Sequence, residues 1–140
     1  MSAFLKGFAH AFAALDASRL DQLDRLYSAD VLFQDPLHRI EGLPALREYF
    51  AQLYANVSDL HYDFHGYDET APGEGYLRWT LRYRHPRLNA GAPVELPGCS
   101  YLRWNDRVYS HQDFFDAGAL LYEHLPVFGP LIRWLKRRLA

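Results

Sequence analysis

Val31-Leu32-Phe33-Gln34-Asp35-Pro36 is the stretch that decides the fold of this 140-residue chain. A short apolar run ends at a carboxylate, and Leu43-Pro44 then opens a helix, since Pro is tolerated in a first helical turn. Asp35 is therefore expected at the end of a strand, beside a hydrophobic interior. Desolvation there raises the pKa of a carboxylate and makes it a usable proton acceptor. The same Asp-Pro pair also fits an Asx turn that only stops the strand, so both interpretations stay open.

Two amphipathic helices are predicted before this stretch. Apolar residues recur every three and four positions over residues 4–16, which is one face of a helix. Ser18 is expected to cap a second helix, with Asp21 at the position where an acidic side chain accepts a hydrogen bond from the cap residue. Because Ala17 alone joins the two helices, we expect them to fold back on each other as a hairpin.

Beyond the third helix the hydrophobic period changes to two, which predicts strands. Apolar and polar residues alternate over residues 60–65 and 77–84, and two further strands follow over residues 94–104 and 108–115. The connections between them are short and rich in Pro, Gly or Asn. Long strands joined by short turns predict an antiparallel meander covered on one face by helices, which is an α+β fold.

The C-terminal segment has a different character. Residues 125–130 break the chain, and residues 131–139 are predicted to form a short helix with four cations, which suit a helix C-terminus. We favour packing over the mouth of the barrel or against a partner subunit, because nine residues are short for lying on a membrane surface. The expected organisation is one domain over residues 1–140, with a core over 1–124 and a basic helical extension over 125–140.

Composition excludes several classes of function. The net charge of −2 gives no general drive toward nucleic acid or an anionic membrane. Cys99 is the one cysteine, so the chain cannot form an internal disulfide. No signal-peptide pattern is found, and no apolar run approaches the roughly 20 residues of a membrane span. We therefore expect a cytoplasmic protein.

The last strand carries a second constellation, His111-Gln112-Asp113-Phe114-Phe115-Asp116. A period of two sends Tyr109, His111, Asp113 and Phe115 to one face. An imidazole two residues from a carboxylate on one face can be oriented by it. A histidine on a sheet face is more often structural, so both interpretations stay open. Asp116 is expected to cap a helix that begins after it.

No metal site is predicted. His61, Asp63 and His65 share one strand face, but residues two apart on a strand lie ~7 Å apart, so one strand offers at most an adjacent pair to an ion. We interpret them as an exposed or dimer-facing row. The arginines of the next strand, Arg78, Arg82, Arg84 and Arg87, are interpreted in the same way.

The order of two helices, Phe33-Gln34-Asp35-Pro36, a third helix and four alternating strands resembles the NTF2-like superfamily, and residues 111–116 resemble a stretch common in its SnoaL-like members. The resemblance implies a cystatin-like cone, with N-terminal helices packed on a curved antiparallel sheet and an extra C-terminal helix. In ketosteroid-isomerase-like members a strand-end Asp-Pro supplies the general base, which implies that role for Asp35. Polyketide cyclases and epoxide hydrolases of the family use an acid from the last strand, which implies a role for His111 and Asp113.

Two departures from the family pattern argue against two of the family's activities. The isomerases stabilise an enolate with a Tyr and a protonated Asp, and those places hold Phe12 and Ser100 here. Phe12 cannot donate a hydrogen bond and the Ser100 hydroxyl is a weaker donor than a carboxylic acid, so steroid isomerase activity is disfavoured. The epoxide hydrolases need Arg-x-Asp on a middle strand, whereas Arg19-Leu20-Asp21 lies on a predicted helix.

Two functions remain open. In the first, a small hydrophobic carbonyl compound enters the cone and Asp35 transfers a proton with help from His111 and Asp113, in an isomerisation, cyclisation or dehydration. No cofactor is expected, because no Gly-rich phosphate loop or flavin motif is found. In the second, the chain is a non-catalytic ligand-binding or assembly domain. With either function we expect a homodimer through the sheet face, because long strands with Trp and Tyr on both faces are seldom left bare. The residues expected to line the ligand site are Phe12, Phe33, Tyr54, Trp79, Ser100, Tyr109 and Phe115.

Overall fold

The structure, a computed structural model, describes residues 2–120 and 128–140. Its helices are α1 (Ala3–Ala13), α2 (Leu23–Leu26), α3 (Leu43–Asn56), α4 (Ala117–Leu120) and α5 (Phe128–Leu139), with short 3₁₀ segments η1 (Leu20–Gln22) and η2 (Asn89–Gly91). Its strands are β1 (Tyr27–Gln34), β2 (Arg39–Glu41), β3 (Ser58–Ala71), β4 (Glu74–Arg84), β5 (Val94–Trp104) and β6 (Val108–Phe115).

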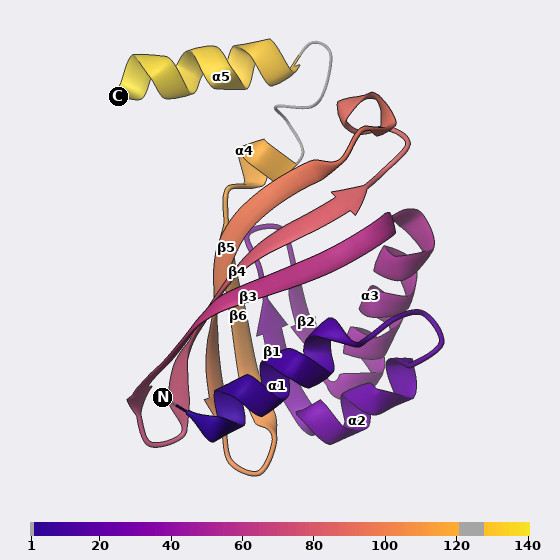
Figure 1. Cartoon of the computed structure of the whole chain (residues 1–140), viewed down its shortest axis with the longest axis vertical. Helices are drawn as coiled ribbons and strands as arrows, with labels where there is room; N and C mark the ends of the chain where they lie inside the picture. The colour runs from indigo at the N-terminus through magenta and orange to yellow at the C-terminus, as the bar shows by residue number, and fades with distance from the viewer. Residues whose placement is uncertain (1, 121–127) are drawn as a thin grey trace.

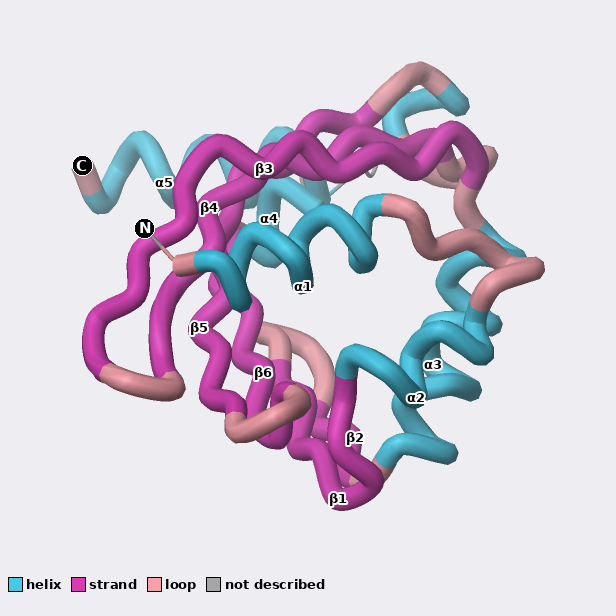
Figure 2. The backbone as a smooth tube through the Cα atoms, turned by 60° about the horizontal axis from the view of Figure 1, so that its bottom comes forward, coloured by secondary structure: helices cyan, strands magenta, loops and turns pink. Residues whose placement is uncertain are grey.

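The strands form one six-stranded sheet in the order β2-β1-β6-β5-β4-β3. The sheet curves around α1, and α1, α2 and α3 lie on the same side of it (Figures 1 and 2). This arrangement confirms the predicted α+β cone. One detail is corrected: β1 and β6 are parallel, with Phe33 beside His111, so the sheet is mixed rather than wholly antiparallel. The chain returns to β1 only after a long crossover, as a parallel pair requires.

Strand β4 shows how alternation builds the interior. Its apolar residues are buried and the arginines between them are exposed, as predicted: Leu77, Trp79, Leu81 and Tyr83 inside, Arg78, Arg82 and Arg84 outside. Opposite Trp79, at Gly98, a Cβ would lie 2.4 Å from the Trp79 ring. Only glycine fits there, because real side-chain carbons do not approach so closely.

The N-terminal connection differs from the prediction. Ser18 does not cap a helix; its backbone N–H and its hydroxyl donate to the Asp16 carboxylate, at 2.9 and 2.6 Å. This local turn competes with helix formation, so α1 ends at Ala13 and η1 begins only at Leu20. A short turn of helix therefore replaces the predicted helical hairpin.

The C-terminal helix α5 begins at Phe128, three residues earlier than predicted, with Pro130 in its first turn. The predicted start of the extension at residue 125 lies outside the described residues, and so does the part of the predicted irregular segment that precedes residue 128. Figure 1 shows α5 beyond α4, apart from α1, α2 and α3. Asp116 accepts from the Gly118 N–H at 2.9 Å, which confirms the predicted cap. None of the described helices is long and apolar enough to cross a membrane.

Candidate functional site

A cavity of about 620 Å³ lies between α3 and the inner face of the sheet. This volume is in the range of small-molecule sites. Its aromatic lining comprises Phe33, Tyr49, Phe50, Tyr62, Trp79, Tyr83 and Phe115. Two carboxylates, Asp35 and Asp113, lie on the same wall, and no Lys or Arg is among the described residues that line it. The lining is therefore mostly apolar and carries its charge as carboxylates.

His111 and Asp113 lie together on the inner face of β6. His111 Nε2 is 2.6 Å from Asp113 Oδ1, and Nδ1 is 2.7 Å from the Tyr27 hydroxyl. Burial, together with the charge of Asp113, raises the pKa of Tyr27 well above its usual value, so the phenol keeps its proton. Because a carboxylate only accepts, the arrangement that satisfies all three groups has His111 Nε2–H donating to Asp113 and the Tyr27 hydroxyl donating a hydrogen bond to His111 Nδ1.

The same Asp113 oxygen has a second donor. Trp79 Nε1–H donates to the Ser100 hydroxyl at 2.9 Å, and Ser100 donates its own hydrogen to Asp113 Oδ1 at 2.5 Å. Ser100 therefore orients Asp113 rather than a ligand. Asp113 Oδ2 has no hydrogen bond to any residue in the described part of the chain, and Asp113 lines the cavity. Asp113 lines the small hollow behind the cavity as well, so Oδ2 is the Asp113 oxygen without a donor among the described residues.

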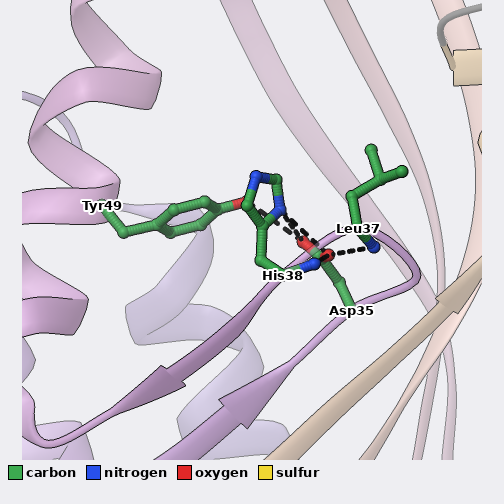
Figure 3. Close-up of polar contacts among 4 residues, drawn as sticks. All are labelled: Asp35, Leu37, His38 and Tyr49. Carbon is green, nitrogen blue, oxygen red and sulfur yellow. Dashed lines mark hydrogen bonds and ion pairs between the residues drawn. The ribbon is translucent and has the colours of Figure 1, made fainter.

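Asp35 occupies the turn between β1 and β2 (Figure 3). Its Oδ1 accepts from the backbone N–H groups of Leu37 and His38 at 2.8 and 2.7 Å, and the His38 ring nitrogen lies 3.0 Å away. Its Oδ2 accepts from the Tyr49 hydroxyl at 3.1 Å. The side chain is 4% exposed. Asp35 thus both forms the Asx turn and lines the cavity, and both of its oxygens already accept hydrogen bonds.

Two tyrosine hydroxyls lie near these carboxylates, and Gln52, Asn56, Tyr83 and His85 add further polar groups to the lining. Burial raises the pKa of Tyr49, and the adjacent Asp35 raises it further. Burial also raises the pKa of Tyr62, with added effects from the charges of Asp113 and Asp35. Both phenols therefore stay protonated donors at neutral pH. Tyr49 donates to Asp35, whereas the Tyr62 hydroxyl makes no hydrogen bond to a described residue and is available to a ligand.

Most of the predicted site residues come together. The residues that line the large cavity are Phe33, Asp35, Trp79, Asp113 and Phe115. The residues that lie behind it, around a small hollow that Asp113 and Trp79 also line, are Phe12, Ser100 and His111. Phe12 is buried with its ring against those of Tyr62 and His111. It therefore supports the site from behind.

Tyr54 and Tyr109 do not line either space. The Tyr54 ring packs on Phe50, and burial raises the pKa of Tyr54 to about 12. In β6, Ser110 pairs with Arg103 and Val108 pairs with Trp104, so Tyr109 is the extra residue of a bulge. The Arg103 guanidinium lies 5.8 Å from its ring centroid. The strict alternation predicted for Tyr109 and His111 is therefore wrong.

Four residues of the site, Tyr27, His38, Tyr49 and Tyr62, were not predicted from the sequence. Tyr27 was not expected at a strand start, and its partner His111 is 84 positions away, so nothing local pointed to the pair. His38 belongs to the site only because the turn at Asp35 brings it there. Tyr49 and Tyr62 lie at apolar positions of the third helix and of the strand over residues 60–65, and this periodicity was the available signal.

The other reactive side chains lie elsewhere. His61, Asp63 and His65 are exposed on β3, as predicted. No group of three or more His, Cys, Asp or Glu among the residues described is arranged to hold a metal ion. Burial, with the charge of Asp113, raises the pKa of the Cys99 thiol, which opposes formation of a nucleophilic thiolate.

A family model described as a SnoaL-like domain matches residues 8–111. Solved structures with a similar fold include a protein of ketosteroid isomerase-like fold from Catenulispora acidiphila in complex with trimethylamine (17% identity, TM-score 0.74, 90% of this chain and 95% of that chain covered). Others are TsrD from Streptomyces laurentii (15%, 0.75, 90% and 97%) and a putative SnoaL-like polyketide cyclase from Shewanella putrefaciens (17%, 0.70, 86% and 94%). At these identities the likeness shows the fold alone. No match was found among curated proteins.

Proposed function

The chain belongs to the SnoaL-like domain family, and we propose that it binds a small hydrophobic carbonyl compound and transfers a proton on it without a cofactor. The observation that carries the proposal is Asp113 Oδ2, a carboxylate oxygen without a donor on the wall of an apolar cavity. The reaction class is isomerisation, cyclisation or dehydration, each of which begins with removal of a proton next to a carbonyl.

Asp113 is the proposed base. Its Oδ2 takes a proton from the carbon beside the carbonyl; the electron pair of that C–H bond forms a C=C bond, and the π pair of the carbonyl moves to its oxygen. The Tyr62 hydroxyl donates a hydrogen bond to the enolate oxygen, in the role that Phe12 and Ser100 cannot fill. His111 and Ser100 hold Asp113 by Oδ1, so that Oδ2 stays directed at the ligand. The protonated Asp113 then returns the proton to the product.

Asp35 is the alternative base, as the Asp-Pro motif implies. Both of its oxygens already accept hydrogen bonds, which favours a supporting role in which it holds Tyr49 and the turn at the cavity wall. The charge of the lining limits the ligand, because two carboxylates without a Lys or Arg among the described lining residues repel an anion. The trimethylamine bound by the Catenulispora acidiphila relative is likewise small and not anionic.

2-Tetralone tests this proposal without knowledge of the natural substrate, because it is a flat bicyclic ketone with acidic protons beside the carbonyl. In D₂O, NMR follows the exchange of those protons for deuterium. The protein should accelerate the exchange, and Asp113→Asn should lower the acceleration by about 100-fold or more. Asp35→Asn should lower it by a smaller factor.

Asp63→Asn is the matched control, because Asp63 is an exposed carboxylate of the same sheet. Its exchange rate should equal that of the wild-type protein. If Asp35→Asn abolishes exchange and Asp113→Asn does not, Asp35 is the base. If the wild-type protein binds 2-tetralone without accelerating exchange, proton transfer is excluded for this class of ketone.

A non-catalytic binding domain is the second candidate. It is favoured by the internal use of the Ser100 hydroxyl and of both Asp35 oxygens, which leaves few polar groups for a reaction. Either function is compatible with a homodimer through the outer sheet face. Tyr76 and Phe114 are exposed there, beside a hollow of about 540 Å³, and apolar surface of this kind often marks an interface.

A further inference from the structure

Helix α5 presents a row of large apolar side chains to solvent. Leu131, Trp134 and Leu135 are 48%, 48% and 42% exposed, and Leu139 is more exposed still. Their spacing of three and four residues puts them on one side of the helix. Among the described residues the other exposed large hydrophobic side chains are scattered over β4, β6 and the β1–β2 turn. Only α5 gathers them into a continuous row.

The helix is attached to the rest of the protein by a different side. Lys136 forms an ion pair with Asp116. One turn earlier, Ile132 lies against Gly118, where a Cβ would come within 3.2 Å of it. None of the described α5 residues lines the cavity, so the predicted packing over the barrel mouth is not found. These contacts leave the apolar row uncovered.

Positive charge is concentrated in this helix. Four of the fifteen Lys and Arg residues lie in α5 and none of the seventeen Asp and Glu residues does, so the rest of the chain holds eleven cations against seventeen acids. The Arg138 guanidinium lies 5.5 Å from the centroid of the Trp134 ring. An indole beside a cation suits the headgroup level of a bilayer, where the ring is half-immersed and the charge meets lipid phosphates.

We propose that α5 docks on an anionic lipid surface, with Leu131, Trp134 and Leu135 entering the interface and with Arg137 and Arg138 contacting the headgroups. A nucleic acid would use the cations but would leave the apolar row exposed to water. An anionic bilayer takes up both. The acidic remainder of the chain is repelled by the same surface, so the helix is the part that makes contact.

Trp134 gives a direct readout with the full chain, because Trp79 and Trp104 are buried. Vesicles of phosphatidylcholine with about 30% phosphatidylglycerol should shift its emission to the blue and carry the protein down on centrifugation. Binding should be at least about tenfold weaker for phosphatidylcholine alone and should weaken as salt is raised. Leu135→Glu, and separately Arg137→Gln with Arg138→Gln, should each weaken binding about tenfold or more.

Arg82→Gln with Arg84→Gln is the matched control, because it removes two exposed cations from β4 and should leave vesicle binding unchanged. Circular dichroism checks that every variant is folded. Absence of binding to the anionic vesicles overturns the proposal, and so does equal binding by Leu135→Glu. If Leu135→Glu instead changes the oligomeric state of a protein that ignores vesicles, a second copy of the chain covers the row.

Discussion

Asp35 and Asp113 lie on the wall of one cavity, and the donors around them differ. Asp35 has hydrogen bonds at both oxygens, whereas Asp113 has both of its donors on Oδ1. A carboxylate held in that way is fixed in orientation while one oxygen remains open to a ligand. The assignment of Asp113 as base rests on this asymmetry, which no local sequence pattern expresses.

Tyr62→Phe tests the other half of the reaction. Removing the hydroxyl removes a cavity-lining donor that makes no hydrogen bond to a described residue, but keeps the ring that packs on Phe12 and Trp79. The rate of 2-tetralone exchange should fall by about 10- to 1,000-fold, with little change in affinity for the ketone. Tyr54→Phe is the control, since it lies outside the cavity; an equal loss in both variants would contradict a specific role for Tyr62.

Buried tyrosines make the protein sensitive to alkali. Burial raises the pKa of Tyr54 to about 12 and that of Tyr83 to about 12, against 10.0 for a free phenol. The contribution of these phenols to the free energy of unfolding is fully present below pH 10, because the tyrosine is then protonated in both the folded and the unfolded chain. Above pH 10 the tyrosine of the unfolded chain ionises first, and the contribution is lost. The free energy of unfolding should fall by about 1.4 kcal/mol per pH unit for each group.

Urea unfolding at a series of pH values, with tyrosinate absorbance recorded in parallel, measures this loss. Tyr54→Phe should flatten the decline between pH 10 and about 12, the window set by its two pKa values. A decline with the same slope in the variant would show that Tyr54 does not contribute to it.

At the scale of elements, alternation predicted β5 and β6 with their correct bounds, because it depends only on neighbouring residues. What the sequence could not provide was the pairing of elements. The parallel pair of β1 with β6 and the bulge at Tyr109 depend on strands distant in the chain. The Ser18 cap was wrong because Asp16 offered a competing turn that a capping pattern does not weigh.

Gly98 is the element-scale position where one atom decides packing. A Cβ there would lie 2.4 Å from the Trp79 ring and 2.8 Å from the Phe114 carbonyl oxygen. Gly98→Ala should therefore lower the free energy of unfolding by about 1–3 kcal/mol, since the ring must shift in a packed core. Gly7→Ala is the contrasting variant, because nothing lies within 4 Å of its Cβ.

In the α1 interior, Gly7→Ala should be stabilising by up to about 1 kcal/mol. Chemical denaturation of both variants measures the difference. Equal stability of the two would mean that Trp79 can move away from Gly98, and the Trp79 bond to Ser100 would then not be rigid.

At the scale of the whole molecule, the candidate site is assembled from parts far apart in sequence. The sequence indicated Asp35, His111 and Asp113 because each lies in a recognisable local pattern. It could not indicate the hydrogen bonds from Tyr27 through His111 to Asp113, or that the Ser100 hydroxyl donates to Asp113. These bonds join strands β1, β5 and β6, which come together only in the folded sheet.

The outer face of the same sheet leads to the last prediction. Phe114 is exposed on β6 in a row with Cys99 and Arg78, beside Tyr76. If this face joins two copies, Phe114→Arg puts like charges opposite each other across the twofold axis and should convert a dimer to a monomer in sedimentation velocity. Leu37→Arg is the control, because Leu37 is similarly exposed but lies at the β1–β2 turn. A wild-type protein that sediments as a monomer would contradict the interface, and a dimer lost only in Leu135→Glu would assign it to α5.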